Sequence, residues 1–496
     1  MARNRVLALA LFATLPGLAS AVHLSDGEGQ VLIYPYYTVN NGLMTLLQVS
    51  NHRDEVKALS IQFLEGNNGR DVLGFNLYLK PHDTWTAALY ATGAESAPRL
   101  TSADATCSVP MVPGAGVDFR SFAYAHGEVD DGGSSSLIRT REGHIQIIEM
   151  GVVEGSLALA AANGNCQTIM QAWMPEGIWA TDPSVGMSPP GGGLAGSAAV
   201  VDVEEGVIYS YRATTIDGFS GIVQHHPPGS LKPTLASAAG STATANVGAT
   251  WLADDGTAVH ARWPRARAID AVSAVLARVS VSNRFTQESG LAAESEWILN
   301  FPTKAFYTDN RPGGRIVGSP WPPFSVAFDG DHPLTGDPVA GGACTFHPLF
   351  ARDREGNLAH PDPETCTPTD PDCGPMRLAT CHVTQVVSLG HAQGSIAASP
   401  LLGSLRMAPF RPAPGGQVSP DSDTVAPVGA FESGYATLDM TASIRESQEG
   451  IRPQGLPVIA LGLKRIVNNN AVPGRLANYA AAIPHSSRSE VEFAED

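Results

Sequence analysis

Positive charge is scarce in this chain of 496 residues. Only 16% of the residues are charged, and 31 basic side chains face 48 acidic ones, which gives a net charge of −17. Globular proteins usually carry about a quarter charged residues. Because a surface with little positive charge has little attraction for phosphate backbones, we expect no nucleic-acid partner.

The sequence also lacks a long hydrophobic run. A helix needs about 20 predominantly apolar residues to cross a bilayer. The first apolar stretch, residues 6–15, is shorter than that and is followed by Pro16 and Gly17. We therefore expect no transmembrane anchor in the mature chain.

Common catalytic signatures are missing as well. The chain contains no G-x-S-x-G, H-E-x-x-H or G-x-x-x-x-G-K-[ST] motif. Residues 191–196 match G-x-G-x-x-G, but they follow Pro189 and Pro190 instead of a strand, so they predict no dinucleotide site. No cofactor is predicted. A pair of glycosidase carboxylates would leave no sequence signature, so a hydrolase remains open.

The first 21 residues have the features of a signal peptide. Arg3 and Arg5 precede the apolar stretch, and Ala19-Ser20-Ala21 supplies the small residues of a cleavage site. We expect cleavage between Ala21 and Val22. The mature protein is then periplasmic, on the outer surface or extracellular.

Six cysteines are present, an even number, and an exported chain meets oxidising conditions. They cluster as two and four along the sequence, which makes three local pairs the simplest arrangement. The predicted disulfides are Cys107 with Cys166, Cys344 with Cys381, and Cys366 with Cys373.

Two metal sites compete with simpler interpretations. Zinc bound by the four later cysteines, with His347, His360 and His382 nearby, would need a compact ligand spacing that the sequence does not have. Calcium at Asp329, Asp331 and Asp337 would use a loop rich in oxygen ligands, but the EF-hand spacing is incomplete. We favour disulfides for the first cluster and a solvated turn for the second.

Short apolar runs separated by polar, often glycine-containing turns predict strands. Five such runs lie between residues 31 and 89, and Leu59, Ile61 and Phe63 alternate as on a strand with one buried face. With Phe75 and Leu77 they form the expected core. The predicted fold is mainly β, an antiparallel sandwich of immunoglobulin-like or jelly-roll-like type with long Pro/Gly-rich loops and a few short helices.

The length of the mature chain favours two β-rich domains. We expect them at residues 22–225 and 251–496, packed as one unit or separate. Residues 226–250 are rich in small and turn-forming residues and are expected to form an exposed loop or linker.

Three other groups of residues invite a functional interpretation. Tyr34, Tyr36, Tyr37, Trp85 and Tyr90 could stack on sugars, but aromatic residues in strands usually pack in cores. Lys304 lies among aromatic residues, where its stem is expected to cover apolar surface. His225 and His226 precede two prolines and are expected on a loop surface.

Seven short segments are spread over most of the chain, at residues 34–38, 75–79, 83–87, 206–211, 270–276, 301–309 and 476–479. Together they resemble a family of proteobacterial exported proteins with no assigned activity. The resemblance implies no catalytic residue. Loops at 227–247 and 358–375 depart from the pattern of that family.

These features predict an exported, non-enzymatic protein of the periplasm or cell surface with a structural or interaction role. Its expected partners are other envelope proteins or surface polysaccharide. Two alternatives are an extracellular hydrolase acting on polysaccharide or peptide, and a carbohydrate-binding protein. A pocket with paired carboxylates would favour the hydrolase, and a flat row of exposed aromatic residues would favour sugar binding.

Overall fold

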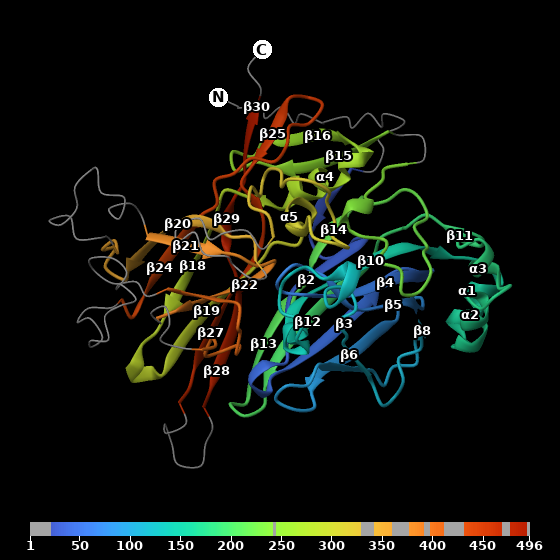
Figure 1. Cartoon of the computed structure of the whole chain (residues 1–496), viewed down its shortest axis with the longest axis horizontal. Helices are drawn as coiled ribbons and strands as arrows, with labels where there is room; N and C mark the ends of the chain where they lie inside the picture. Colours follow the sequence, from blue (N-terminus) through green and yellow to red (C-terminus); the bar gives the residue numbers. More distant parts are fainter. Residues whose placement is uncertain are drawn as a thin grey trace, which may run out of the picture.

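The computed structural model of this chain describes residues 21–241, 245–328, 342–359, 376–390, 397–410, 431–468 and 477–493. Its elements are mainly antiparallel strands, with a few short helices (Figure 1). Four larger sheets pack face to face in two pairs. This arrangement confirms the predicted class, a mainly β, sandwich-like fold.

The first sandwich contains two sheets from the N-terminal half. Sheet I has the order β1 (His23–Ser25), β14 (Thr214–Asp217), β2 (Val31–Thr38), β10 (Glu142–Val153), β4 (Val56–Glu65), β5 (Asp71–Leu79) and β8 (Cys107–Val109), with β11 (Met187–Ser188) paired to β10. Sheet II has the order β13 (Val207–Arg212), β12 (Leu194–Asp202), β3 (Met44–Asn51), β6 (Thr84–Ala91), β7 (Pro98–Thr101) and β9 (Val117–Asp118).

Side chains that alternate along the strands fill the space between these two sheets. The five predicted core residues, Leu59, Ile61, Phe63, Phe75 and Leu77, are at most 4% exposed, which confirms them. The ring of Phe75 on β5 meets Trp85 on β6 edge to face, with centroids 5.9 Å apart. An aromatic pair of this geometry stabilises the contact between the two sheets by more than the burial of its apolar area alone would.

The second sandwich comes from the C-terminal half. Sheet III has the order β21 (Met376–Thr380), β20 (Thr345–Asp353), β24 (Ser433–Asp439), β18 (Ser280–Thr286) and β29 (Ser486–Arg488). Sheet IV has the order β23 (Met407–Phe410), β22 (Thr384–Leu389), β19 (Ala293–Asn300), β27 (Ile459–Ile466) and β28 (Tyr479–Pro484), with β22 and β23 parallel.

Sheet IV is covered on both faces. Trp297 and Leu299 of β19 pack in one core with Leu438 of sheet III. Ile298, between them in sequence, belongs to the core of the first sandwich. Because successive side chains of a strand point to opposite faces, β19 joins the two sandwiches. The halves expected at 22–225 and 251–496 therefore share their hydrophobic cores.

Smaller elements close the remaining edges, and several of them lie at the top of Figure 1. They are β15 (Asn246–Leu252) paired with β16 (Ala258–Pro264), β17 (Ala277–Arg278) with β26 (Leu456–Pro457), β25 (Ile451–Gln454) with β30 (Glu490–Phe493), α4 (Ala268–Leu276) and α5 (Ala305–Thr308). Short 3-10 helices are η1 (Asn40–Gly42), η2 (Gly127–Val129), η3 (Leu137–Arg141), η4 (Leu235–Ser237), η5 (Arg265–Arg267) and η6 (Ser289–Leu291).

The segment 226–250 is not wholly an exposed loop. Leu235, Ala238 and Ala239 are at most 1% exposed, and β15 begins inside the segment at Asn246. The small side chains that suggested a flexible linker instead allow this segment to pack closely against α4. Helix α4 is buried along its whole length and is apolar except at Asp270 and Ser273.

Three helices lie beside the first sandwich, at the right of Figure 1: α1 (Gly155–Ala162), α2 (Cys166–Ala172) and α3 (Ile178–Thr181). A disulfide between Cys107 and Cys166 ties α2 to β8, and a second joins Cys344 to Cys381. Both are pairs predicted from the sequence, whereas Cys366 and Cys373 lie outside the described residues. Within the described ranges, no helix has the length and apolar character needed to span a bilayer.

The disulfide set can be tested by peptide mapping of the purified protein without reduction. We expect three linked peptides, which join Cys107 to Cys166, Cys344 to Cys381, and Cys366 to Cys373. The first closes a span of 59 residues, so its removal should lower the free energy of unfolding by roughly 4 kcal/mol in the chain-entropy model. A peptide joining Cys107 to a cysteine beyond residue 340 would contradict the set.

Candidate functional site

A cleft in the described part of the structure has a volume of about 1390 Å³. It lies beside the β15–β16 hairpin, where β1, β29 and the residues before β25 also reach its walls. Trp251, Val275 and Ala249 give it an apolar lining. A concave site with an apolar lining and a few polar groups is the usual form of a ligand site.

Trp251 is the largest apolar side chain of this cleft. It is 8% exposed, and its indole Nε1 has no hydrogen-bond partner among the described residues. Leu252, which follows it at the rim, is 67% exposed. The cleft therefore offers a ligand an indole surface and exposed apolar area.

Two of the three acidic residues that line the cleft, Glu449 and Asp254, are held in ion pairs, whereas Asp217 has no ion pair with a described residue. The Glu449 carboxylate accepts from Arg262 Nε at 2.6 Å and from the Arg262 backbone N–H at 2.8 Å. Asp254 accepts from the Ser489 N–H at 2.8 Å and pairs with Arg488 at 3.3 Å. Burial tends to raise the pKa of Glu449, but the hydrogen bonds from Arg262 lower it below its ordinary value. A glycosidase acid needs a raised pKa, so Glu449 is held in the opposite state.

The other polar groups of the cleft are bonded to nearby atoms of the fold. His260 shares a hydrogen bond of 2.9 Å with the Thr250 hydroxyl. Arg278 donates to the carbonyls of Val275 and Ala277 at 3.2 and 2.6 Å, and burial lowers its pKa. These contacts hold the side chains in place against the fold.

The expected cleavage site lies at this cleft. Ala21 is part of the lining, and Val22 is fully buried. The Val22 N–H donates to the Gly248 carbonyl at 2.9 Å, and the Val22 carbonyl accepts from the Thr250 N–H at 2.8 Å. Cleavage before Val22 would leave an N-terminal residue that is already built into the fold.

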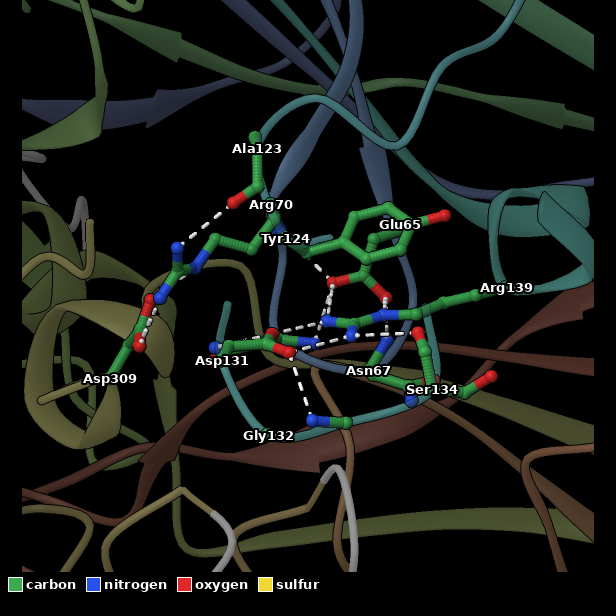
Figure 2. Close-up of polar contacts among 12 residues, drawn as sticks. Glu65, Asn67, Arg70, Ala123, Tyr124, Asp131, Gly132, Ser134, Arg139 and Asp309 are labelled. Carbon is green, nitrogen blue, oxygen red and sulfur yellow. Dashed lines mark hydrogen bonds and ion pairs between the residues drawn. The ribbon is translucent and has the colours of Figure 1, made fainter. Parts of the chain in front are cut away.

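The densest group of charges lies elsewhere, in the buried junction between the two halves (Figure 2). Arg139 bridges Glu65 at 2.8 Å and Asp131 at 2.5 Å, and its guanidinium lies 4.2 Å from the ring centroid of Tyr124. Burial tends to raise the pKa of Glu65, but Arg139 lowers it to about 2. The carboxylate therefore stays ionised, and its partners fix it in place.

Arg70, at the left in Figure 2, forms the direct link between the halves. Its Nε and Nη2 donate to the two oxygens of Asp309 at 2.7 and 2.8 Å. Both side chains are at most 4% exposed. A buried, bidentate pair of this kind fixes the geometry of the junction strongly.

A second buried chain of contacts lies next to it. Arg406 pairs with Glu142 at 2.7 Å and donates to the Arg139 carbonyl at 2.7 Å. The Tyr36 hydroxyl donates to the same Glu142 carboxylate at 2.9 Å. These contacts join β2, β10 and the loop before β23, and they leave Arg406 only 6% exposed.

Glu296 on β19 is buried without an ion pair to any described residue. Its carboxylate accepts from the N–H groups of Leu401 and Leu402 at 3.0 and 3.2 Å and from the Ser399 hydroxyl at 3.0 Å. Burial raises its pKa to about 7 against these hydrogen bonds. The loop at residues 399–405 is thus bound to sheet IV through one carboxyl group.

The residues singled out by sequence are mostly structural. Lys304 is 1% exposed, donates to the Thr380 carbonyl at 3.1 Å, and has its pKa lowered by burial to about 7. Its ammonium lies 5.6 and 5.5 Å from the ring centroids of Phe301 and Phe324. The amino group of Lys304 is therefore buried in the core, and the side chain does more than cover apolar surface with its stem.

The glycine-rich segment 191–196 surrounds an anion that belongs to the protein itself. The Gly191 and Gly192 N–H groups donate to the Glu149 carboxylate at 2.9 and 2.8 Å, and Lys57 pairs with it at 2.9 Å. The first glycines of the segment thus bind a carboxylate of the protein itself.

The suggested aromatic platform does not form. Four of its five residues, Tyr34, Tyr36, Tyr37 and Trp85, are at most 2% exposed, because they fill the space between sheets I and II. They pack in the core, as aromatic residues in strands usually do. Tyr90 alone is partly exposed.

The prediction that His225 lies on a loop surface is wrong. It is 5% exposed, because it packs against Trp173 and Trp179 and shares a hydrogen bond of 3.0 Å with the Tyr78 hydroxyl. Burial lowers its pKa to about 4.

The metal alternatives gain no support. Cys344 and Cys381 are joined in a disulfide, so they cannot act as the thiolate ligands of a zinc site. His347 shares a hydrogen bond of 2.8 Å with the Thr380 hydroxyl. The calcium candidates Asp329, Asp331 and Asp337, and also His360, lie outside the described residues. No group of three potential metal-binding side chains occurs among the residues that are described.

Sequence reasoning missed the residues that line the cleft and those of the junction. Trp251, Arg262 and Glu449 meet only in the fold, and no local motif marks them. Comparison with known protein families, with curated proteins and with solved structures found no match.

The junction pair can be tested with Arg70→Met. Removing one partner leaves the buried Asp309 charge without its counter-ion, so the free energy of unfolding should fall by about 3–5 kcal/mol in urea denaturation. Arg99→Met is the matched control, because Arg99 also binds both oxygens of one aspartate, Asp118, but at the surface. Equal losses in the two variants would contradict the role given to the junction.

The carboxyl of Glu296 should make stability depend on pH. Between pH 4.5 and about 7 the folded chain keeps a proton that the unfolded chain has released. Stabilisation by the protonated carboxyl is therefore complete below pH 4.5 and is lost as the pH rises through about 7. The difference in unfolding free energy between wild type and Glu296→Gln should fall by roughly 3 kcal/mol over this range. The exposed Glu95→Gln is the control, and its difference in unfolding free energy from the wild type should not change with pH. If the difference for Glu296→Gln also stayed constant between pH 4.5 and about 7, the raised pKa of Glu296 would be refuted.

Proposed function

We propose that this protein is exported and acts in the periplasm or on the cell surface by binding a partner, without catalysing a reaction. Export is supported by the leader-like residues 1–21 and by Val22, which is buried directly after the expected cleavage site. The disulfides Cys107–Cys166 and Cys344–Cys381 suit an oxidising compartment.

The observation that carries the binding role is the state of two acidic residues that line the cleft beside the β15–β16 hairpin. Glu449 and Asp254 are each held by an arginine, and hydrogen bonds from Arg262 lower the pKa of Glu449. Such groups recognise and orient a ligand better than they transfer protons to it. The apolar lining around Trp251 adds area that a ligand can bury.

The hydrolase alternative is the direct rival, and one experiment separates the two. The exported protein is incubated with envelope polysaccharide and with cell-wall peptides, and new reducing ends and amino groups are measured. We expect none, together with retention of the protein on at least one of these materials. If products form with the wild type and not with the double variant Asp254→Asn/Glu449→Gln, the protein is a hydrolase and the proposed binding role is wrong.

The site of export is checked on the same preparation. N-terminal sequencing should read Val-His-Leu-Ser, because cleavage is expected before Val22. A chain that still begins at Met1 and stays in the membrane fraction would contradict export.

A further inference from the structure

The outer face of sheet III carries a row of exposed side chains that the fold itself does not use. Strand β24 lies between β18 and β20, and Tyr435 stands opposite Arg284 on one neighbour and Arg352 on the other. All three side chains are exposed. Cross-strand partners stand on the same face of a sheet, so these three form one continuous row.

Phe350 extends the row along the sheet. It lies two residues before Arg352 on β20, so its side chain is on the same face, and it is 40% exposed beside Tyr435 at 42%. The opposite face of these strands is buried through Leu349, Ala351 and Leu438. Two large aromatic side chains on the solvent face are therefore not needed for the core of sheet III.

The arginines of this row have no acidic partner among the residues described. Arg352 donates only to the Gly356 carbonyl, at 2.9 Å, and no ion pair with a described residue involves Arg284. Arg377 on β21 stands opposite Pro348, on the same face. The acidic residue on this face of β24 is Asp439, which lies four residues from Tyr435 and binds the Thr441 N–H at 3.0 Å.

We infer that this face, defined by Arg284, Arg352, Phe350 and Tyr435, binds an acidic polysaccharide whose sugars carry carboxylates. The inference rests on the proposed binding role and gives it a partner class. A guanidinium offers a planar fork that matches a carboxylate, and an aromatic ring packs against the apolar face of a sugar. The two arginines lie two strand spacings apart, about 10 Å, so they can bind carboxylates on different sugars of one chain.

Charge complementarity selects this occupant. A chain with net charge −17 repels an acidic polymer over most of its surface, so binding needs a local patch where cations are free. A neutral glycan would use the aromatic side chains and leave the arginines without a role. Single-stranded nucleic acid would also stack on aromatic side chains and pair with arginines, and it is therefore included in the test.

The test measures binding of the exported protein to alginate, a uronic acid polymer, with dextran as the neutral probe and oligo(dT) as the nucleic acid. We expect alginate to bind more tightly than either. Arg284→Gln/Arg352→Gln should weaken alginate binding about tenfold at low salt, and this difference should shrink as salt is raised. Tyr435→Ser/Phe350→Ser should weaken it at both salt concentrations.

Arg120→Gln/Arg212→Gln is the matched control, because both arginines are exposed and lie outside sheet III. It should bind alginate as the wild type does. Circular dichroism and thermal melting confirm that each variant is folded, which these exposed positions should allow.

Three results would overturn the inference: alginate binding no tighter than dextran binding, equal weakening in the control and in the sheet III variants, or tighter binding of oligo(dT) on the same residues. Retention on dextran alone would leave the binding role intact and remove only the acidic partner. Breakdown of the polymer would instead overturn the proposed function itself.

Discussion

Strands β19 and β22 are buried on both faces, and the packing of the two sandwiches depends on this constraint. Side chains of β19 alternate between the core of the second sandwich, through Trp297, and the core of the first, through Ile298. Separating the halves would expose the face of β19 that carries Ile298, at a cost of about 25 cal/mol for each Å² of apolar surface. The β-rich halves therefore fold as parts of one structure.

A strand buried on both faces also forces polar groups into the interior, and the junction shows how they are satisfied. Glu296 receives backbone and hydroxyl donors, whereas Glu65 and Asp309 are each bound by an arginine with a fork of donors. Arginine suits this role better than lysine, because its planar group reaches several acceptors and stays charged when buried. Lys304 shows the contrast: it makes one hydrogen bond to a carbonyl, and burial lowers its pKa to about 7.

Sequence reasoning succeeded where the information is local. The alternation at Leu59, Ile61 and Phe63 predicted a buried strand face, because side chains of a strand repeat every two residues. It failed where the information lies in distant contacts: nothing near Arg70 indicates that Asp309, far along the chain, will be its partner. His225 and residues 226–250 were misplaced because small and turn-forming residues resemble a surface loop until a neighbouring element packs against them. The cleft around Trp251 and Glu449 was missed for the same reason, since its walls come from separate parts of the chain.

Arginine side chains have two different roles in this structure, one in the buried junction and one on the surface, and the composition alone does not distinguish them. Inside the junction, Arg70, Arg139 and Arg406 are surrounded by acceptors, so their charge is neutralised and does not extend to the surface. On sheet III, Arg284 and Arg352 stand beside Tyr435 and form no ion pair with a described residue, so their charge is available to a partner. In a chain with more acidic than basic groups, most arginines have a carboxylate within reach, so an arginine row without one marks a surface suited to an external anion. The same fold thus uses one side chain type to join its halves and, on a different face, to present free positive charge.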